Sequence, residues 1–165
     1  MLEKKYWYQE AHELCCHWSQ ETGYSVPQVA SVVAVLSPMC SWSQNLRWAH
    51  SLLHNNNAPC LGLQANHDKA LRILAGEPIH TVLKGEKVKS FYACILRPHC
   101  SSVVIDRHML KIVKWPKDTV TRNQYHKLAN IFRYRANLVG MPVPEYQALT
   151  WLWQRGDLKQ LVFGY

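Results

Sequence analysis

The sequence lacks any long hydrophobic run. Its longest apolar stretch extends from Val29 to Leu36 and is interrupted by Ser31. This is far short of the roughly 20 residues that cross a bilayer. Residues 1–5 also lack the apolar segment and the small-residue cleavage site of a signal peptide. We therefore expect a cytoplasmic protein that does not associate with a membrane.

Regular cysteine spacing is also missing. The six cysteines include no Cys-x-x-Cys pair, and cytoplasmic thiols remain reduced, so no disulfide framework is expected. Two local groups of cysteine and histidine lack the separated ligand pairs of a structural zinc site. These groups are Cys15, Cys16 and His17, and Cys94, His99 and Cys100. The sequence therefore predicts no metal site.

Acidic residues are scarce relative to basic ones. Nineteen Lys and Arg stand against eleven Asp and Glu, which leaves a net charge of +8. Residues 84–123 alone hold nine Lys or Arg and three acids, so they carry +6 of this charge. The excess indicates a polyanionic partner, with nucleic acid first, although a solvated basic face is the alternative. Hydrophobic residues make up 48% of the chain and charged residues 18%, which excludes a disordered protein.

The alternating pattern of β-strands is almost absent. Apolar residues recur instead at helical spacing, which predicts an all-α fold, a two-lobed helical bundle of a size that 165 residues allow. A capping box of Ser25 and Gln28, and caps at Ser41, Asp68 and Asp106, mark helix starts. The expected helices cover 3–20, 26–36, 42–54, 68–76, 86–97, 106–115, 122–138 and 144–156. The expected buried stripes are Trp7, Ala11, Leu14 and Trp18; Leu46, Ala49, Leu52 and Leu53; and Leu71, Ile73 and Leu74.

Three local motifs resemble those of the helix-hairpin-helix DNA glycosylases of the endonuclease III and 8-oxoguanine glycosylase type. The turn at 82–89, Val-Leu-Lys-Gly-Glu-Lys-Val-Lys, is similar to the family's Leu-Pro-Gly-x-Gly-x-Lys hairpin. Residues 103–108, Val-Val-Ile-Asp-Arg-His, are similar to its Val-Asp-x-His segment. The apolar segment 32–36, followed by Ser37 and later Asn45, is similar to its Leu-Ser-x-Gln segment. The family's Gln is replaced here by Met39 or a neighbour.

The resemblance implies one helix-hairpin-helix glycosylase-like domain over residues 1–165, with the hairpin at about 78–97 and the helix of the catalytic Asp at about 106–115. A glycine turn that enters a helix leaves backbone N–H groups free for a phosphate. We expect DNA contacts from this turn and from the start of the later helix. The residues concerned are Lys84, Gly85, Glu86, Lys87, Val88, Arg107 and His108.

The expected chemistry needs a lysine amine and a carboxylate. A desolvated amine can attack sugar C1′, and Asp106, held ionised by a helix N-terminus, stabilises positive charge on the sugar. The turn has only one of the family's two hairpin glycines, so two alignments are open. If Gly85 matches the second glycine, the nucleophile is Lys87. If Leu83 and Gly85 match the Leu-x-Gly at the start of the pattern, the nucleophile is Lys89. We favour Lys87 because the Gly-x-Lys step sets a close backbone approach.

Aromatic side chains near the basic segment are candidates for a base pocket. Trp42, Phe91 and Tyr92 could stack on an extruded base, or Phe91 and Tyr92 could be helical core instead. Because Cys100 is the last cysteine, no four-cysteine cluster follows Asp106, and neither an iron–sulfur cluster nor another cofactor is expected.

The sequence thus predicts a monomeric DNA glycosylase with AP lyase activity that acts on double-stranded DNA. The alternative is a non-catalytic helix-hairpin-helix module that only binds DNA. A third interpretation is a basic helical protein that assembles with other proteins.

Overall fold

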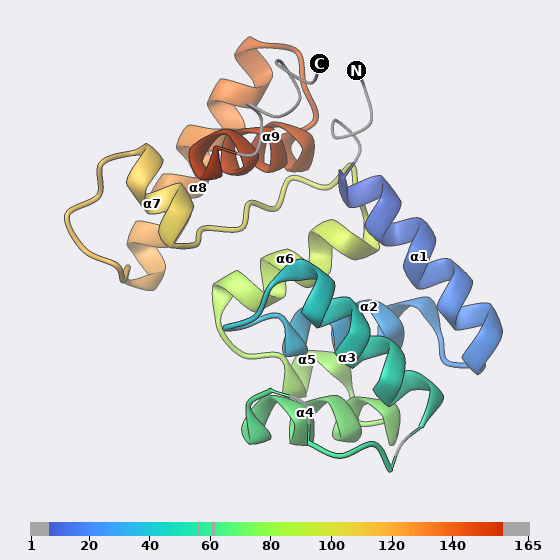
Figure 1. Ribbon diagram of the computed structural model, residues 1–165. Helices are drawn as coiled ribbons and strands as arrows, with labels where there is room; N and C mark the ends of the chain where they lie inside the picture. The colour runs from blue at the N-terminus through green and yellow to red at the C-terminus, as the bar shows by residue number, and fades with distance from the viewer. Residues whose placement is uncertain (1–6, 56, 61, 157–165) are drawn as a thin grey trace. The chain divides into compact units, whose positions relative to one another are not determined.

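The computed structural model describes residues 7–55, 57–60 and 62–156, and within them all regular secondary structure is helical (Figure 1). The all-α prediction is confirmed. No helix in this part of the chain is both long and apolar enough to cross a membrane. The helices are α1 (Trp7–Thr22), α2 (Val26–Leu36), α3 (Trp42–His54), α4 (Gln64–Leu74), α5 (Ile79–Val82), α6 (Glu86–Leu96), α7 (Arg107–Ile112), α8 (Arg122–Leu138) and α9 (Val143–Arg155).

The chain divides into two compact units. Unit 1 combines Met1–Glu10 with Ala93–Tyr165, and unit 2 comprises Ala11–Tyr92. Unit 2 therefore contains α2 to α5 and the turn that follows α5, whereas unit 1 contains Asp106 and α7 to α9.

Unit 2 is built around α2. The side chain of Ser25 accepts a hydrogen bond from the backbone N–H of Gln28, and the Gln28 side chain accepts one from the backbone N–H of Ser25, so the predicted capping box is confirmed. All eight residues from 29 to 36 are buried, and both α3 and α4 pack on this helix (Figure 1). Asn45 of α3 donates a 3.1 Å hydrogen bond to the carbonyl of Val33, which fixes α3 against α2.

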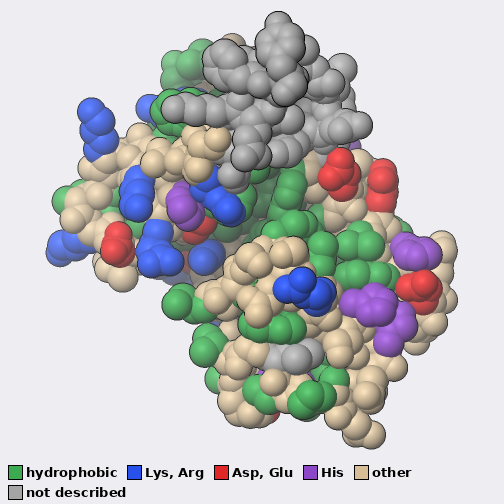
Figure 2. Space-filling view, in the orientation of Figure 1, with side chains coloured by type: hydrophobic (Ala, Val, Ile, Leu, Met, Phe, Trp, Pro, Cys, Tyr) green, Lys and Arg blue, Asp and Glu red, His purple; other side chains and the backbone are tan. Residues whose placement is uncertain are grey.

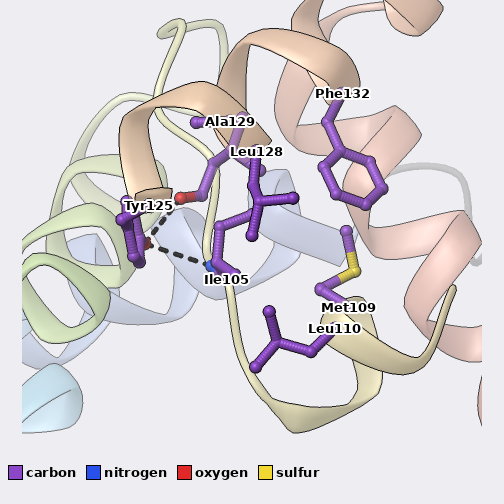
Figure 3. Packing of buried hydrophobic residues seen from close by; sticks show 8 residues of the cluster. Ile105, Met109, Leu110, Tyr125, Leu128, Ala129 and Phe132 are labelled. Atoms are coloured by element: carbon purple, nitrogen blue, oxygen red, sulfur yellow. Dashed lines mark hydrogen bonds between the residues drawn. The ribbon is translucent and has the colours of Figure 1, made fainter. Parts of the chain in front are cut away.

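Unit 1 has its own apolar core, in which residues of α7 and α8 pack around an extended segment at 103–105 (Figure 3). The residues of this segment are buried, and no strand lies beside them in the part of the chain that the structure describes. The Tyr125 hydroxyl takes the place of a strand partner, because it accepts from the N–H of Ile105 at 3.1 Å and donates to the carbonyl of Val103 at 2.8 Å. A single side chain thus satisfies two buried backbone groups. The cluster comprises Val103, Ile105, Met109, Leu110, Tyr125, Leu128, Ala129 and Phe132.

Some local predictions were wrong. Asp68 does not cap α4, because this helix begins four residues earlier and Asp68 instead accepts a hydrogen bond from the Gln64 side chain within it. Leu46, Leu71 and Leu74 are only half-buried, whereas Asn45 is 1% exposed.

The boundaries of two other helices also differ from the sequence predictions. Helix α1 extends to Thr22, two residues beyond its predicted end, and residues 3–6 of its predicted start lie outside the described residues. Its buried stripe contains Ala11 and Trp18 as predicted, but Tyr8 and Cys15 replace Trp7 and Leu14. Helix α7 ends at Ile112 rather than near 115, because the N–H of Trp115 bonds back to the carbonyl of Leu110 while Lys114 adopts a left-handed conformation, with φ of 52°.

Candidate functional site

The residues of the predicted hairpin include a short turn between α5 and α6. Leu83, which follows α5, is buried and anchors the turn, and Gly85 lies in the left-handed region with φ of 79°. A Cβ at position 85 would meet open space, so the backbone conformation, and not crowding, requires glycine here. Helix α6 begins at the next residue, Glu86. The turn therefore presents the start of an 11-residue helix to an incoming group.

Three lysines surround this turn. Lys84, Lys87 and Lys89 are all exposed, while Glu86 and Val88 are half-buried. Among the residues that the structure describes, neither Lys87 nor Lys89 takes part in an ion pair. The lysines thus leave positive charge facing solvent next to the backbone N–H groups at the start of α6.

Asp106 caps α7, as its sequence position predicted. Its Oδ1 accepts a 3.0 Å hydrogen bond from the backbone N–H of Met109, and its Oδ2 accepts a 2.8 Å bond from Nε1 of Trp151 in α9. The residue is half-buried. Both carboxylate oxygens are therefore held by N–H donors, which fixes the orientation of the side chain.

Side chains of α7 and α9 pack around the Trp151 ring that holds this carboxylate. The His108 ring lies edge-on to the Trp151 ring, with 5.9 Å between centroids. The Arg155 guanidinium sits 4.4 Å from the Trp151 ring centroid, within cation–π range. Arg107 is exposed. No sequence pattern predicts Trp151 here, because its contact with Asp106 spans 45 residues and only the packing of α9 creates it.

The predicted base-pocket residues belong to unit 2. The rings of Trp42 and Phe91 meet edge-on, with centroids 6.3 Å apart, and all three predicted residues, including Tyr92, are half-buried. Met39 lies in the loop between α2 and α3, where it is 82% exposed and has a positive φ of 65°. An exposed apolar side chain on left-handed backbone is unusual for a residue other than glycine.

The two predicted catalytic groups belong to different units. Lys87 and Lys89 lie in unit 2, and Asp106 lies in unit 1 with Arg107 and His108. Their convergence on a single sugar stays a prediction.

The charge is distributed unequally between the units. The described residues of unit 1 include ten Lys or Arg and four Asp or Glu, whereas those of unit 2 include six and five. Figure 2 shows many of the basic side chains of unit 1 on one face, over α7 and the loop that follows it. On α7, Arg107 and Lys111 are both exposed. Unit 1 is therefore the more basic of the two.

A pair of neighbouring thiols, one buried and one half-buried, lies in unit 1. The sulfur atoms of Cys94 and Cys100 are 4.0 Å apart. The hydrogen bond from Cys94 lowers the pKa of the Cys100 thiol to about 6, although partial burial acts in the opposite direction. The same hydrogen bond, together with burial, raises the pKa of Cys94. Burial also raises the pKa of the nearby Tyr8, whose hydroxyl donates to Gln147 at 3.0 Å.

The loop between α7 and α8 forms an open depression. Its lining includes Trp115, Lys117, Val120 and Gln124. None of the predicted site residues lines it.

Comparison with known proteins gives one match. Residues 2–158 match a family model described as a family of unknown function, DUF7178. No curated protein and no solved structure matches the chain.

Proposed function

The chain belongs to the DUF7178 family, whose function is unknown, and we propose from its own residues that it binds double-stranded DNA and excises a base. The observation that carries the proposal is the turn before α6, where a left-handed Gly85 is followed directly by a helix and flanked by exposed lysines. Backbone N–H groups at a helix N-terminus favour a phosphate, and the lysines add charge.

The basic face of unit 1 supports DNA as the partner. Proteins bind DNA partly through contacts that do not depend on base sequence. Phosphate contacts by Lys and Arg supply most of this part of the affinity. Exposed Arg107 and Lys111 on α7 are suited to such contacts.

The proposed reaction uses one lysine and Asp106. The Lys87 amine, in its neutral form, attacks C1′ of an extruded nucleotide, and the bond from C1′ to the base breaks with its electron pair leaving on the base, which takes up a proton. Asp106 stabilises the positive charge that develops on the sugar. The nitrogen lone pair then expels O4′, which takes up a proton from water, and the opened sugar is a protonated Schiff base. Loss of a C2′ proton to this electron sink eliminates the 3′ phosphate, which leaves with its electron pair.

Unit 2 offers side chains for holding the opened duplex. Met39 is exposed at a loop tip and can insert between bases, as apolar side chains do in proteins that unstack DNA. Trp42 and Phe91 present adjacent aromatic rings on which an extruded base can stack.

A second function is a DNA-binding module without catalysis. The observation that favours it is the exposure of both Lys87 and Lys89, because a lysine that acts as a nucleophile is usually shielded from water. If the chain is an enzyme, the bound DNA must exclude water from the lysine amine that attacks the sugar.

Borohydride trapping separates the two functions. The full chain is incubated with a duplex that contains one abasic site, reduced with borohydride, and examined for a covalent adduct. The enzyme is expected to give an adduct that disappears in either Lys87→Gln or Lys89→Gln and persists in the control Lys69→Gln on α4. Duplex binding without an adduct and without base release would establish the non-catalytic module.

A further inference from the structure

A glutamate and two histidines meet at the carboxyl ends of α1 and α3. Glu21 lies in the last turn of α1, and His50 and His54 lie one turn apart on α3. One ligand atom from each of the three side chains lies within 4.8 Å of the other two. Figure 2 shows histidine side chains beside an acidic one on the right of the view. All three residues belong to unit 2, so their arrangement is internal to one compact body.

The hydrogen bonding of His54 directs one ring nitrogen toward the glutamate. Its Nδ1 lies 2.8 Å from the carbonyl oxygen of His50, so Nδ1 carries the proton and donates it there. In the neutral ring Nε2 then keeps its lone pair, and this atom faces Oε2 of Glu21 at 3.5 Å. Donation of the second ring N–H to a backbone carbonyl is typical of metal-binding histidines.

Neighbouring side chains contact the other two groups. The His50 ring stacks on that of His54 at 4.0 Å between centroids, and the buried Trp18 meets it edge-on at 5.5 Å. His17, one turn before Glu21 on α1, places its Nε2 3.3 Å from the second carboxylate oxygen, Oε1. The carboxylate is thus held on one side and faces the two imidazoles with the other.

We propose that Glu21, His50 and His54 bind a divalent transition-metal ion of the Zn²⁺ type. Two imidazole nitrogens and one carboxylate oxygen suit zinc and its neighbours, whereas Ca²⁺ and Mg²⁺ require oxygen ligands. With metal–ligand bonds near 2.0–2.1 Å, neighbouring ligand atoms of a tetrahedral site lie about 3.3 Å apart. The His54–Glu21 pair, at 3.5 Å, is already close to this separation, and the exposed side chains can close the remaining gaps by rotation.

Such an ion would join the end of α1 to the end of α3 and leave a fourth position open to solvent. The site lies outside the DNA-binding and catalytic residues proposed above, so its test is independent of theirs. It shares no residue with the two groups of cysteine and histidine considered in the sequence analysis, at 15–17 and 94–100.

Competition with a chromophoric chelator tests the site directly. The full chain is titrated with Zn²⁺ in the presence of excess Mg²⁺, alongside His54→Gln, Glu21→Gln and the matched control His126→Gln, an exposed histidine of α8 in unit 1. Loss of a neighbour of a metal ligand costs about 10–100-fold in affinity, so loss of a ligand should weaken Zn²⁺ binding by at least about 10-fold. The control should bind as the unaltered chain does.

Two results would overturn the proposal. One is an unaltered chain that does not compete with the chelator. The other is Zn²⁺ affinity that is equal in His54→Gln, Glu21→Gln and the unaltered chain, which would place any bound ion elsewhere, for example on the thiols. Circular dichroism of each variant confirms that it is folded, as expected for exposed positions.

Discussion

The indole N–H of Trp151 donates a 2.8 Å hydrogen bond to the Asp106 carboxylate, and so joins the last helix to the cap of α7. The other carboxylate oxygen is occupied by the backbone N–H of Met109. The side chain that the proposed reaction requires is therefore positioned by two elements and has little freedom to rotate.

Replacement of Trp151 by Phe should destabilise unit 1. The variant removes a hydrogen bond to a charged group, worth about 1.5–3 kcal/mol when buried, and half-burial of Asp106 reduces the expected loss in free energy of unfolding to about 1 kcal/mol. Urea denaturation measures it. Trp153→Phe is the control, because Trp153 lies on the same helix and is 63% exposed. Equal stability of the two variants would show that the hydrogen bond contributes nothing.

Tyr125→Phe should cost more. The substitution keeps the ring but leaves the N–H of Ile105 and the carbonyl of Val103 without their partner in a buried segment. Each unsatisfied buried group costs about 1–3 kcal/mol. We expect a fall of about 2–4 kcal/mol in the free energy of unfolding, compared with almost none for Tyr134→Phe, whose side chain is 64% exposed. If the free energy of unfolding falls no more in Tyr125→Phe than in Tyr134→Phe, water satisfies both backbone groups.

Cys100 should react as a thiolate at unusually low pH. Its pKa is about 6 because Cys94 donates a hydrogen bond to the ionised sulfur, whereas an ordinary thiol has a pKa of about 8.5. Since the folded value is the lower one, ionisation stabilises the folded chain fully above the ordinary pKa, and this contribution is lost as the pH falls through about 6.

Alkylation with iodoacetamide, followed by peptide mapping, measures this titration. The rate at Cys100 should reach half its maximum near pH 6, and Cys94→Ala should move the midpoint toward the ordinary value. A midpoint that does not change in Cys94→Ala would contradict the role of the thiol pair.

DNA binding should depend on salt through the basic face of unit 1. If Arg107 and Lys111 each neutralise a phosphate, Arg107→Gln and Lys111→Gln should each reduce the slope of log affinity against log salt by about 1. Fluorescence anisotropy with a labelled duplex at several salt concentrations gives the slope. Lys69→Gln should leave it unchanged, and an identical slope in all variants would remove α7 from the interface.

Much of the helical framework could be predicted because local signals specify it. The bounds of α3 and α8 coincide with those read from periodicity, and the caps at Ser41 and Asp106 are confirmed. The predicted helix cap at Asp68 was wrong, and the reason for this is also local. An Asp before apolar residues resembles a cap, but α4 begins at Gln64 without any side-chain cap.

The candidate site depends more on tertiary contacts. Burial of Asn45 follows from its bond to Val33, and Tyr8 replaces Trp7 in the buried stripe of α1 as it reaches Gln147 in α9. The four-residue spacing of His50 and His54 on a correctly predicted helix was a usable signal, but their approach to Glu21 requires α1 to pack beside α3. No spacing rule reports such contacts between distant segments.

The most direct measurement of the proposed reaction is the position of the covalent adduct. The chain is trapped on an abasic duplex with borohydride, digested, and mapped by mass spectrometry, in parallel with Asp106→Asn. The account predicts the adduct on Lys87, or on Lys89 if the alternative register holds, and at least about 100-fold slower trapping in Asp106→Asn. An adduct outside the turn at 82–89, or none from a chain that binds the duplex, would contradict it.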